Sequence, residues 1–482
     1  MKPIFYGRNS MENSKFIPRE EIEAHLETAR CVAEIFKSRG MVGESAPGYY
    51  IQTFGCQQNE ADSERLAGLA GLMGYRAVST PEEASLILVN TCAIREHAEK
   101  KALSIIGEYK HIREKNPELI VGVGGCMVTQ RHRADKFKMS YPYVGFTFDT
   151  GAIHLVPSLV LKVMQKKGRS FVISDEYKIA EGLPTVRREG GAAWLSIMYG
   201  CNNFCSYCIV PYVRGRERSR LPEDILRDAE ALIADGAKEI TLLGQNVNSY
   251  GKDLDSGETI ASLIKKICAL EGDFRIRFMT SHPKDASEEL LEVVATEPKV
   301  VKHFHLPVQS GSTEVLRRMN RRYTAEHYLG IIDSLKSKLP DISLTTDIIV
   351  GFPGETEEDF EATLDMLRRV EYDMIFSFIY SPRIGTPAAE MEDQIPSEVS
   401  GARFKRLLAL QDEICEARNS RFLGRRVKVL VEGVSKSDEG MLTGRGDMAR
   451  PVHFKGDEGM IGQFVTLEIT SCGSYSLEGK LI

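Results

Sequence analysis

The stretch GCNNFCSYCIVP, residues 200–211, contains three cysteines at spacings of four and three residues, Cys201, Cys205 and Cys208. It directly follows AWLSIMY (residues 193–199), an apolar run that predicts a buried strand. Three thiolates in one loop can bind three irons of a [4Fe–4S] cluster and leave the fourth iron without a protein ligand. A structural zinc site would need a fourth Cys or His close by, and this loop contains no histidine.

Downstream of this loop, strand-like and helix-like segments alternate as far as residue 418. Five further strands are predicted at EITLLG (239–244), RIRFMT (275–280), VKHFHLP (301–307), SLTTDIIVG (343–351) and MIFSFIY (374–380). The first intervening helix has an apolar face, as a crossover helix needs, formed by Ile225, Leu226, Ala229, Leu232 and Ile233. Six repeats predict a partial (β/α)6 barrel, with the cysteine loop at the strand ends where such barrels build their sites.

Upstream, residues 47–170 contain a second strand–helix series. YYIQTF, LILVN and LIVGVG predict parallel strands, and a cysteine follows each of them: Cys56, Cys92 and Cys126. In an open α/β sheet, loops at this position converge on a ligand, so three thiolates again indicate a cluster with an open iron. Buried packing cysteines are the alternative for each position alone. The threefold repetition of one topological position favours the cluster.

The chain as a whole is predicted to be an α/β protein with five parts. Residues 1–46 form an N-terminal extension with one amphipathic stretch, Arg19 to Lys37. They precede the parallel α/β domain (47–170), a linker (171–192) and the barrel (193–418). Residues 419–482 change character, because VKVLVEGV, MLTGRG, GQFVTLEI and YSLEGKLI are short strands between glycine-rich turns. We expect a small β-barrel there.

Composition excludes some classes of protein. The chain has 482 residues, of which 42% are hydrophobic and 27% charged, and no apolar run is long enough to span a membrane. The N-terminus lacks a signal-peptide pattern, so we expect a cytoplasmic protein without membrane contact. Ten cysteines in a reducing compartment indicate metal ligation or packing, and packing is expected for Cys31, Cys268, Cys415 and Cys472. The net charge of −6 disfavours a generally basic nucleic-acid-coating protein.

Several motifs together resemble a known family. CxxxCxxC with an aromatic, Tyr207, before the last cysteine resembles the radical S-adenosylmethionine (SAM) superfamily. The order of three separated cysteines, a CxxxCxxC barrel and a terminal β-barrel over residues 49–482 resembles the methylthiotransferase family. NTCAIREHAEKKA, RFMTSHP, HLPVQSGSTEVLRRMNR, DIIVGFPGETEEDF and YSPRIGTPA are similar to its MiaB-type tRNA enzymes. The terminal barrel is similar to the TRAM domain, an RNA-binding module.

The resemblance implies an activity and its cofactors. Members carry two [4Fe–4S] clusters and use two SAM molecules per turnover. One SAM donates a methyl group to sulfur at the auxiliary cluster, on the first cysteine set, and the other is cleaved to the 5′-deoxyadenosyl radical at the CxxxCxxC cluster. The product is a methylthio group at C2 of N6-isopentenyladenosine at tRNA position 37. The expected partners are the tRNA anticodon stem-loop and an electron donor such as flavodoxin or ferredoxin, and we expect a monomer.

Two other functions remain open from the sequence. A ribosomal-protein methylthiotransferase of the same family has the same three domains and needs the same clusters. A non-catalytic iron–sulfur RNA-binding regulator is disfavoured by an open-iron cluster in a barrel.

Candidate SAM contacts follow the barrel strands. The resemblance implies roles for Tyr207 and for the segment that occupies the place of a glycine–glycine–acid motif, Gly244, Gln245 and Asn246. The acid of that motif is missing here. Gln309 and Asp347 stand at later strand ends and could bind SAM or the base. A role in stabilising turns is the alternative for each of these residues.

Candidate RNA contacts are basic. In RGRERSR, an extended chain would place four side chains on one face, Arg214, Arg216, Arg218 and Arg220, where they would attract phosphates. A solvated loop is the alternative. Arg317, Arg318, Arg321 and Arg322 form a second cluster, and the terminal barrel opens with Arg425, Arg426 and Lys428.

Overall fold

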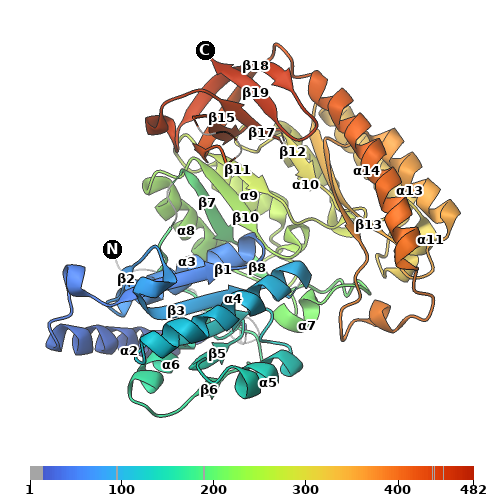
Figure 1. Ribbon diagram of the computed structural model, residues 1–482. Helices are drawn as coiled ribbons and strands as arrows, with labels where there is room; N and C mark the ends of the chain where they lie inside the picture. Colours follow the sequence, from blue (N-terminus) through green and yellow to red (C-terminus); the bar gives the residue numbers. More distant parts are fainter. Residues whose placement is uncertain (1–14, 94–95, 188–189, 437, 439, 449) are drawn as a thin grey trace. The chain divides into compact units, whose positions relative to one another are not determined.

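The computed structural model describes residues 15–93, 96–187, 190–436, 438, 440–448 and 450–482 (Figure 1). The chain divides into two units, which are described separately. Unit 1 comprises the residues up to Arg187, Tyr199–Asn202 and Ile209–Arg220, whereas unit 2 comprises Arg188–Met198, Asn203–Cys208 and Leu221–Ile482. The CxxxCxxC loop therefore contributes to both units. No helix among the described residues has the length and apolarity to cross a bilayer.

Unit 1 is built on one parallel sheet of six strands. Its order is β2 (Arg76–Ala77), β1 (Gly48–Thr53), β3 (Ala84–Thr91), β4 (Ile120–Gly125), β5 (Phe146–Phe148) and β6 (Ser170–Phe171). The three strands predicted here are confirmed as β1, β3 and β4, which are adjacent and parallel. Along β3, Leu86 and Leu88 enter one hydrophobic cluster and Ile87 and Val89 the other, because successive side chains point to opposite faces.

Helices cover both faces of this sheet, as buried parallel sheets require. One cluster draws its residues from α2 (Arg19–Ser38), α3 (Gln57–Leu72) and α6 (Val156–Met164). The other includes residues of α4 (Glu96–Lys115) and α5 (Arg131–Ser140). The prediction of an amphipathic helix before residue 46 is confirmed by α2.

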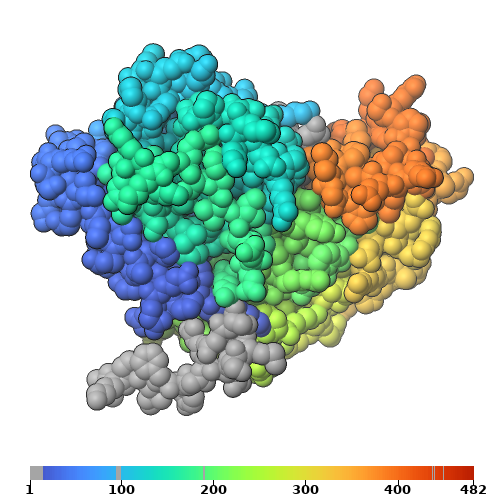
Figure 2. Space-filling view, turned by 90° about the horizontal axis from the view of Figure 1, so that it is seen from below, coloured from blue at the N-terminus to red at the C-terminus, as the bar shows by residue number. Residues whose placement is uncertain are grey.

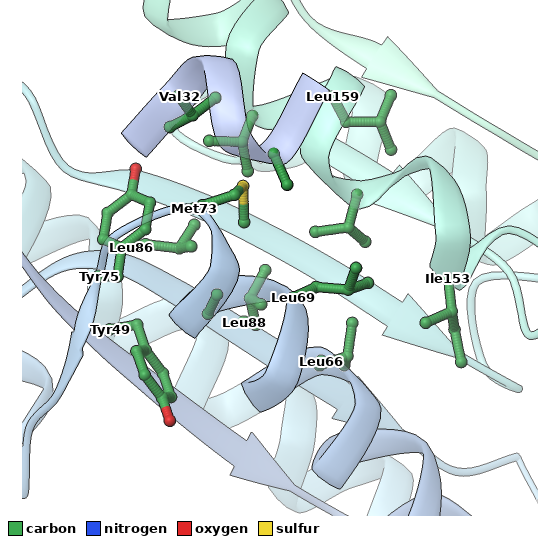
Figure 3. Packing of buried hydrophobic residues seen from close by; sticks show 14 of the residues in the cluster. Val32, Tyr49, Leu66, Leu69, Met73, Tyr75, Leu86, Leu88, Ile153 and Leu159 are labelled. Atoms are coloured by element: carbon green, nitrogen blue, oxygen red, sulfur yellow. The ribbon is translucent and has the colours of Figure 1, made fainter. Parts of the chain in front are cut away.

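Helix α2 is part of the hydrophobic core of unit 1. Figure 3 shows Val32 of α2 in one hydrophobic cluster with Met73 and Leu159. Leu26, Ala29, Val32 and Phe36 recur at three- and four-residue spacings and are buried. Fully burying a large apolar side chain stabilises a fold by about 1.5–3 kcal/mol, so this face is sufficient to hold the helix in place.

Unit 2 contains the predicted partial barrel. Its six parallel strands form two sheets. The first contains β7 (Ala192–Ser196), β10 (Glu239–Leu243) and β11 (Arg275–Phe278), and the second contains β12 (His303–His305), β13 (Ser343–Val350) and β14 (Met374–Ile379). A parallel bridge from Ile276 to Val300 links β11 to the segment before β12. The helices of this series are α8 (Pro222–Ala234), α9 (Ile260–Cys268), α10 (Glu288–Thr296), α11 (Thr313–Arg318), α12 (Ala325–Lys338) and α13 (Glu357–Val370).

A long helix, α14 (Ser397–Ser420), packs against β14 and leads into a closed barrel. The barrel order is β15 (Arg426–Val434), β16 (Leu442–Arg445), β17 (Pro451–Phe454), β19 (Leu477–Leu481) and β18 (Phe464–Cys472). The sequence predicted four of these strands. It missed β17 because that strand is short and begins with a proline, which interrupts the usual strand pattern.

The terminal barrel and the (β/α) barrel are joined by buried arginines. Arg277 donates from Nε to Glu239 Oε1 at 2.8 Å and from Nη2 to the carbonyl oxygen of Gly446 at 2.8 Å. Arg450 is fully buried and donates to the carbonyl oxygen of Asp373. These contacts make the terminal barrel part of unit 2 rather than a freely attached module.

Candidate functional site

The three separated cysteines meet at one edge of the unit 1 sheet. Cys56 is the N-cap of α3, Cys92 directly follows β3, and Cys126 directly follows β4. The backbone N–H of Cys126 donates to the carbonyl oxygen of Thr91 at 2.9 Å. Burial is the main cause that raises the pKa of the Cys126 thiol to about 12; the Arg214 charge opposes this rise, and Cys92 and Cys56 add to it.

Two glycines allow this approach. Gly125 precedes Cys126 with a φ of +96°, and a Cβ there would lie 2.4 Å from the carbonyl oxygen of Thr91. Gly55 precedes Cys56 with a φ of +137°, and a Cβ there would lie 2.9 Å from the Cβ of Cys92. Residues other than glycine rarely adopt such φ values. A glycine directly before a cysteine, as in FGC (residues 54–56) and GGC (residues 124–126), is therefore a local sequence signal for this cysteine site.

Arg214 is the buried partner of this cysteine set. The side chain is 3% exposed and ends helix α7 (Val210–Arg214). Its Nε donates to Cys126 Sγ at 3.2 Å, and its Nη2 donates to Asn59 Oδ1 at 3.2 Å and to Asp62 Oδ2 at 3.0 Å. The guanidinium charge favours the thiolate form of Cys126, which is the form that binds metal.

The RGRERSR segment differs from the extended strand that would align its arginines. It starts at the end of α7 and contains only the short strand β9 (Arg218–Ser219). Arg218 is buried and donates to the carbonyl oxygens of Arg216 and Arg214 at 2.6 and 3.1 Å. Arg220 is 1% exposed and binds both carboxylate oxygens of Glu181 at 2.7 Å. Of these four arginines only Arg216 is exposed.

In unit 2, Arg321 contacts the CxxxCxxC loop. This side chain is 4% exposed, and its Nη1 donates to Cys205 Sγ at 3.4 Å and to the hydroxyl of Tyr207 at 3.5 Å. Its Nη2 donates to the carbonyl oxygen of Pro307 at 2.7 Å. The sequence grouped Arg321 with surface arginines, and only its spatial position reveals the cysteine contact. Burial raises the pKa of Tyr207 well above its usual value.

The backbone of the CxxxCxxC loop is held by contacts inside each unit. In unit 2, Asn320 Nδ2 donates to the carbonyl oxygen of Phe204 at 2.8 Å, and the N–H of Cys208 donates to the carbonyl oxygen of Cys205 at 2.9 Å. In unit 1, the N–H of Cys201 donates to the carbonyl oxygen of Gly215 at 3.1 Å. Protein contacts therefore hold the backbone of the cysteine loop in each unit.

Buried polar atoms without partners lie beyond strands β10 and β11. Asn246 is 1% exposed, and its Nδ2 donates to Asp285 Oδ2 at 2.7 Å while its Oδ1 has no hydrogen-bond partner among the described residues. The same holds for Ser281 Oγ and His282 Nε2. Burial lowers the pKa of His282, so its ring is neutral at pH 7. Such orphaned atoms are costly unless a ligand or water satisfies them.

The other candidate SAM contacts also follow barrel strands. Gly244 directly follows β10, where a Cβ would lie 2.6 Å from Met198 Cγ, and partly buried Gln245 comes next. Gln309 follows β12 with a left-handed φ of +74°, and its N–H donates to the carbonyl oxygen of Asp347 at 2.8 Å. Asp347 lies on β13 with Oδ1 3.7 Å from His305 Nε2. The left-handed φ of Gln309 is a strained conformation for a residue other than glycine, and strain of this kind is concentrated at functional sites.

The basic residues that open the terminal barrel are exposed. Arg425 and Lys428 lie 3.5 Å from Asp341 and Asp273 respectively, and Arg426 is also exposed. Exposed ion pairs contribute about 0–1 kcal/mol, so they are easily exchanged for another anion. Two neighbouring surface hollows share Lys428 in their lining.

The remaining basic cluster and cysteines have ordinary protein contacts. Arg317 pairs with Glu314 on the surface, and Arg318 pairs with Asp393. Cys415 is buried, and Cys268 and Cys472 are partly buried, as packing cysteines are. Cys31 is exposed, so the packing prediction for it is wrong. It lies on the outer side of the amphipathic helix α2.

Three family models match the chain. The radical SAM superfamily matches residues 195–367, a family described as uncharacterized protein family UPF0004 matches residues 48–148, and the TRAM domain matches residues 420–482. A Thermoanaerobacter pseudethanolicus protein named tRNA-2-methylthio-N(6)-dimethylallyladenosine synthase is 46% identical over 473 residues, 98% of this chain and 99% of the relative. A Caldicellulosiruptor saccharolyticus protein of the same name is 51% identical, over 90% of this chain and 92% of the relative.

Solved structures support the fold. The radical S-adenosylmethionine methyltransferase TsrM from Kitasatospora setae aligns with a TM-score of 0.52 at 14% identity, over 71% of this chain and 77% of its own. At this identity the likeness concerns the architecture alone.

Proposed function

Because the chain belongs to the family of tRNA-2-methylthio-N(6)-dimethylallyladenosine synthases, we propose that it methylthiolates tRNA at C2 of N6-isopentenyladenosine, at position 37 beside the anticodon. The observation that carries the proposal is the presence of two separate cysteine sets, each with one cysteine that accepts a hydrogen bond from a buried arginine. A ribosomal-protein substrate is less well supported, because relatives at 46–51% identity are named for tRNA.

We assign one [4Fe–4S] cluster to each cysteine set. The auxiliary cluster is assigned to Cys56, Cys92 and Cys126, and the cluster that binds SAM to Cys201, Cys205 and Cys208. Thiolate donors suit iron–sulfur clusters, and three per site leave one iron open. When bound, the clusters and two SAM molecules per turnover supply the electron, the radical and the methylthio group.

The protein's own residues contribute charge and position. Arg214 favours the thiolate form of Cys126, because it holds a buried positive charge within hydrogen-bond distance of the sulfur, and Arg321 donates a hydrogen bond to Cys205 Sγ. Both side chains also donate to other fixed acceptors. These further hydrogen bonds help to orient each guanidinium toward its cysteine.

Polar ligand groups are proposed to bind beyond the barrel strands. Asn246 Oδ1 can accept from an amino group, and Ser281 Oγ and His282 Nε2 can each satisfy a hydroxyl or base nitrogen. The candidate contacts to SAM and to the adenine are completed by Gly244, Gln245, Gln309 and Asp347. Tyr207, which lies within the cysteine loop, is a further candidate contact. These residues orient the reacting groups, while the surrounding burial excludes water.

The RNA contacts are proposed at the exposed basic residues, Arg216, Arg425, Arg426 and Lys428. Arg214, Arg218 and Arg220 are buried against protein partners, so they are better explained as structural or cysteine-binding residues. The target adenine has to leave the anticodon-loop stack to reach a buried site. An electron donor such as flavodoxin or ferredoxin is required, and we propose that the enzyme acts as a monomer.

Nucleoside mass spectrometry tests the function. Deleting the gene should remove 2-methylthio-N6-isopentenyladenosine from tRNA and leave N6-isopentenyladenosine in its place, and the wild-type gene should restore the product. Complementation with Asn246→Ala should restore little of it. Unchanged 2-methylthio-N6-isopentenyladenosine in the deletion strain would overturn the proposal.

A further inference from the structure

Three side chains of types that can ligate a metal ion meet at the N-terminal end of helix α2, in a region that neither cysteine set uses. Glu21 and His25 are four residues apart on α2 and therefore share a face of the helix. His154 comes from the turn η3 (Ile153–Leu155), just before α6. One ligand atom of each residue lies within 4.8 Å of the others.

The spacing is close to that of a coordinated metal. His154 Nε2 lies 3.7 Å from Glu21 Oε1. Zinc binds nitrogen and oxygen at about 2.0–2.2 Å, so two tetrahedral ligands are about 3.3 Å apart. A small side-chain adjustment therefore brings this pair to the distance that a zinc ion requires.

A further contact orients the second imidazole. His25 Nδ1 is 2.9 Å from Ser158 Oγ of α6, which leaves Nε2 as the ring nitrogen for a metal. Histidines that bind metals usually make such a hydrogen bond through their other nitrogen. The two rings meet edge to face, with centroids 5.3 Å apart and planes at 72°.

The cluster combines burial with access. His154 is 6% exposed, whereas Glu21 is exposed and His25 is partly buried, so one side of the cluster is open to solvent. Figure 2 shows dark blue atoms of this N-terminal region on the surface, and α2 packs against α6.

We propose that Glu21, His25 and His154 bind one Zn²⁺ ion, with water as the fourth ligand. Two imidazoles and one carboxylate are a familiar ligand set for this ion, unlike the all-thiolate sets that hold iron–sulfur clusters. The ion would fasten the first turns of α2 to η3, at the end of the helix that precedes its buried residues Leu26 and Val32. Its role is structural, because it adds a link between two segments of unit 1 that already pack together, α2 and η3.

The test uses the full-length enzyme with its clusters reconstituted under anaerobic conditions. The protein is equilibrated with Zn²⁺, desalted, and examined by elemental analysis and by X-ray absorption at the zinc edge. The variants are Glu21→Gln, which changes an exposed side chain, and His25→Ala. The control is His111→Ala, which removes an exposed histidine 3.3 Å from Glu114; no third potential ligand joins this pair in the part of the chain that the structure describes.

We expect one zinc per chain in the wild type and in His111→Ala, surrounded by nitrogen and oxygen at about 2.0–2.1 Å. Zinc content should fall at least tenfold in Glu21→Gln and His25→Ala. Zinc should also raise the midpoint of thermal unfolding in the wild type and not in these two variants. Three results would each overturn the proposal. They are a sulfur ligand to zinc at about 2.3 Å, a zinc content of the wild type below one-tenth of an ion per chain, and a zinc content of Glu21→Gln and His25→Ala equal to that of the wild type.

Discussion

Replacing Arg214 by methionine tests whether this buried arginine holds the auxiliary cysteine region together. The guanidinium binds Asp62 Oδ2 at 3.0 Å, Asn59 Oδ1 at 3.2 Å and Cys126 Sγ at 3.2 Å, and both members of the ion pair are almost fully buried. Methionine retains much of the side-chain volume but, among the described residues, leaves the Asp62 carboxylate with a hydrogen bond from Gln58 at 3.3 Å and the nearby charge of Arg65.

The expected loss is large. Removing one partner of a buried ion pair typically costs about 3–5 kcal/mol, because the other charge stays desolvated. Arg214→Lys should lose less than the methionine variant, since an ammonium keeps the charge but lacks the planar fork that reaches several acceptors. Replacing both partners, with Arg214→Met and Asp62→Leu, should recover most of the loss, because no uncompensated charge remains.

Hydrogen–deuterium exchange measures this effect locally. Peptides from β3 and β4 report on unit 1, and peptides from β13 in unit 2 serve as an internal reference. A loss of 3–5 kcal/mol accelerates exchange by about 10²- to 10⁴-fold in the unit 1 peptides. Arg216→Met is the matched control, because Arg216 is exposed and its loss should change stability by no more than about 0.5 kcal/mol.

Two results would refute the reasoning. One is a change below about 1 kcal/mol in Arg214→Met, which would mean that the pair contributes no more than a surface ion pair. The other is a double variant at least as unstable as Arg214→Met alone, which would mean that the unpaired carboxylate is not the cause.

Three further predictions concern the clusters and the RNA. Alanine at all three positions of the CxxxCxxC loop should abolish 5′-deoxyadenosine formation while iron and sulfide analysis still detects one cluster; folded protein without any cluster would contradict this. Cys92→Ala should still form 5′-deoxyadenosine but no methylthiolated tRNA, and retained methylthiolation would exclude Cys92 as a necessary ligand. Arg426→Ala with Lys428→Ala should weaken tRNA binding and reduce its log–log salt slope by about 1–2. Both side chains are exposed, so folding should persist, and an unchanged slope would remove them from the interface.

The cysteine sets could be predicted from local sequence. Each cysteine of the auxiliary set follows a short apolar run, and such a run forms a parallel strand whose end position is fixed by hydrophobic burial. Strands β1, β3 and β4 are neighbours, so their ends bring Cys56, Cys92 and Cys126 to one edge. The six barrel strands were predictable for the same reason.

The roles of the arginines were decided only by the tertiary structure. Arg214 and Arg220 stand in a highly charged segment that predicts a solvent or phosphate contact, yet their partners Cys126 and Glu181 lie 88 and 39 residues away in the chain. Arg321 similarly reaches Cys205 across 116 residues. The local sequence shows which residues are charged, but whether a charged side chain is buried depends on segments that are distant in the chain.

The sequence by itself determined the strands, the amphipathic helix α2 and the positions of the six cysteines, because apolar periodicity and residue spacing act over a few neighbouring residues. The tertiary structure alone decided which polar groups became buried and which partners they met. It paired Arg214 with Asp62 and brought His154 to the α2 pair Glu21 and His25. Desolvation makes an unpartnered buried polar group costly, and where such a group is paired, its partner comes from whichever segment the packing brings near.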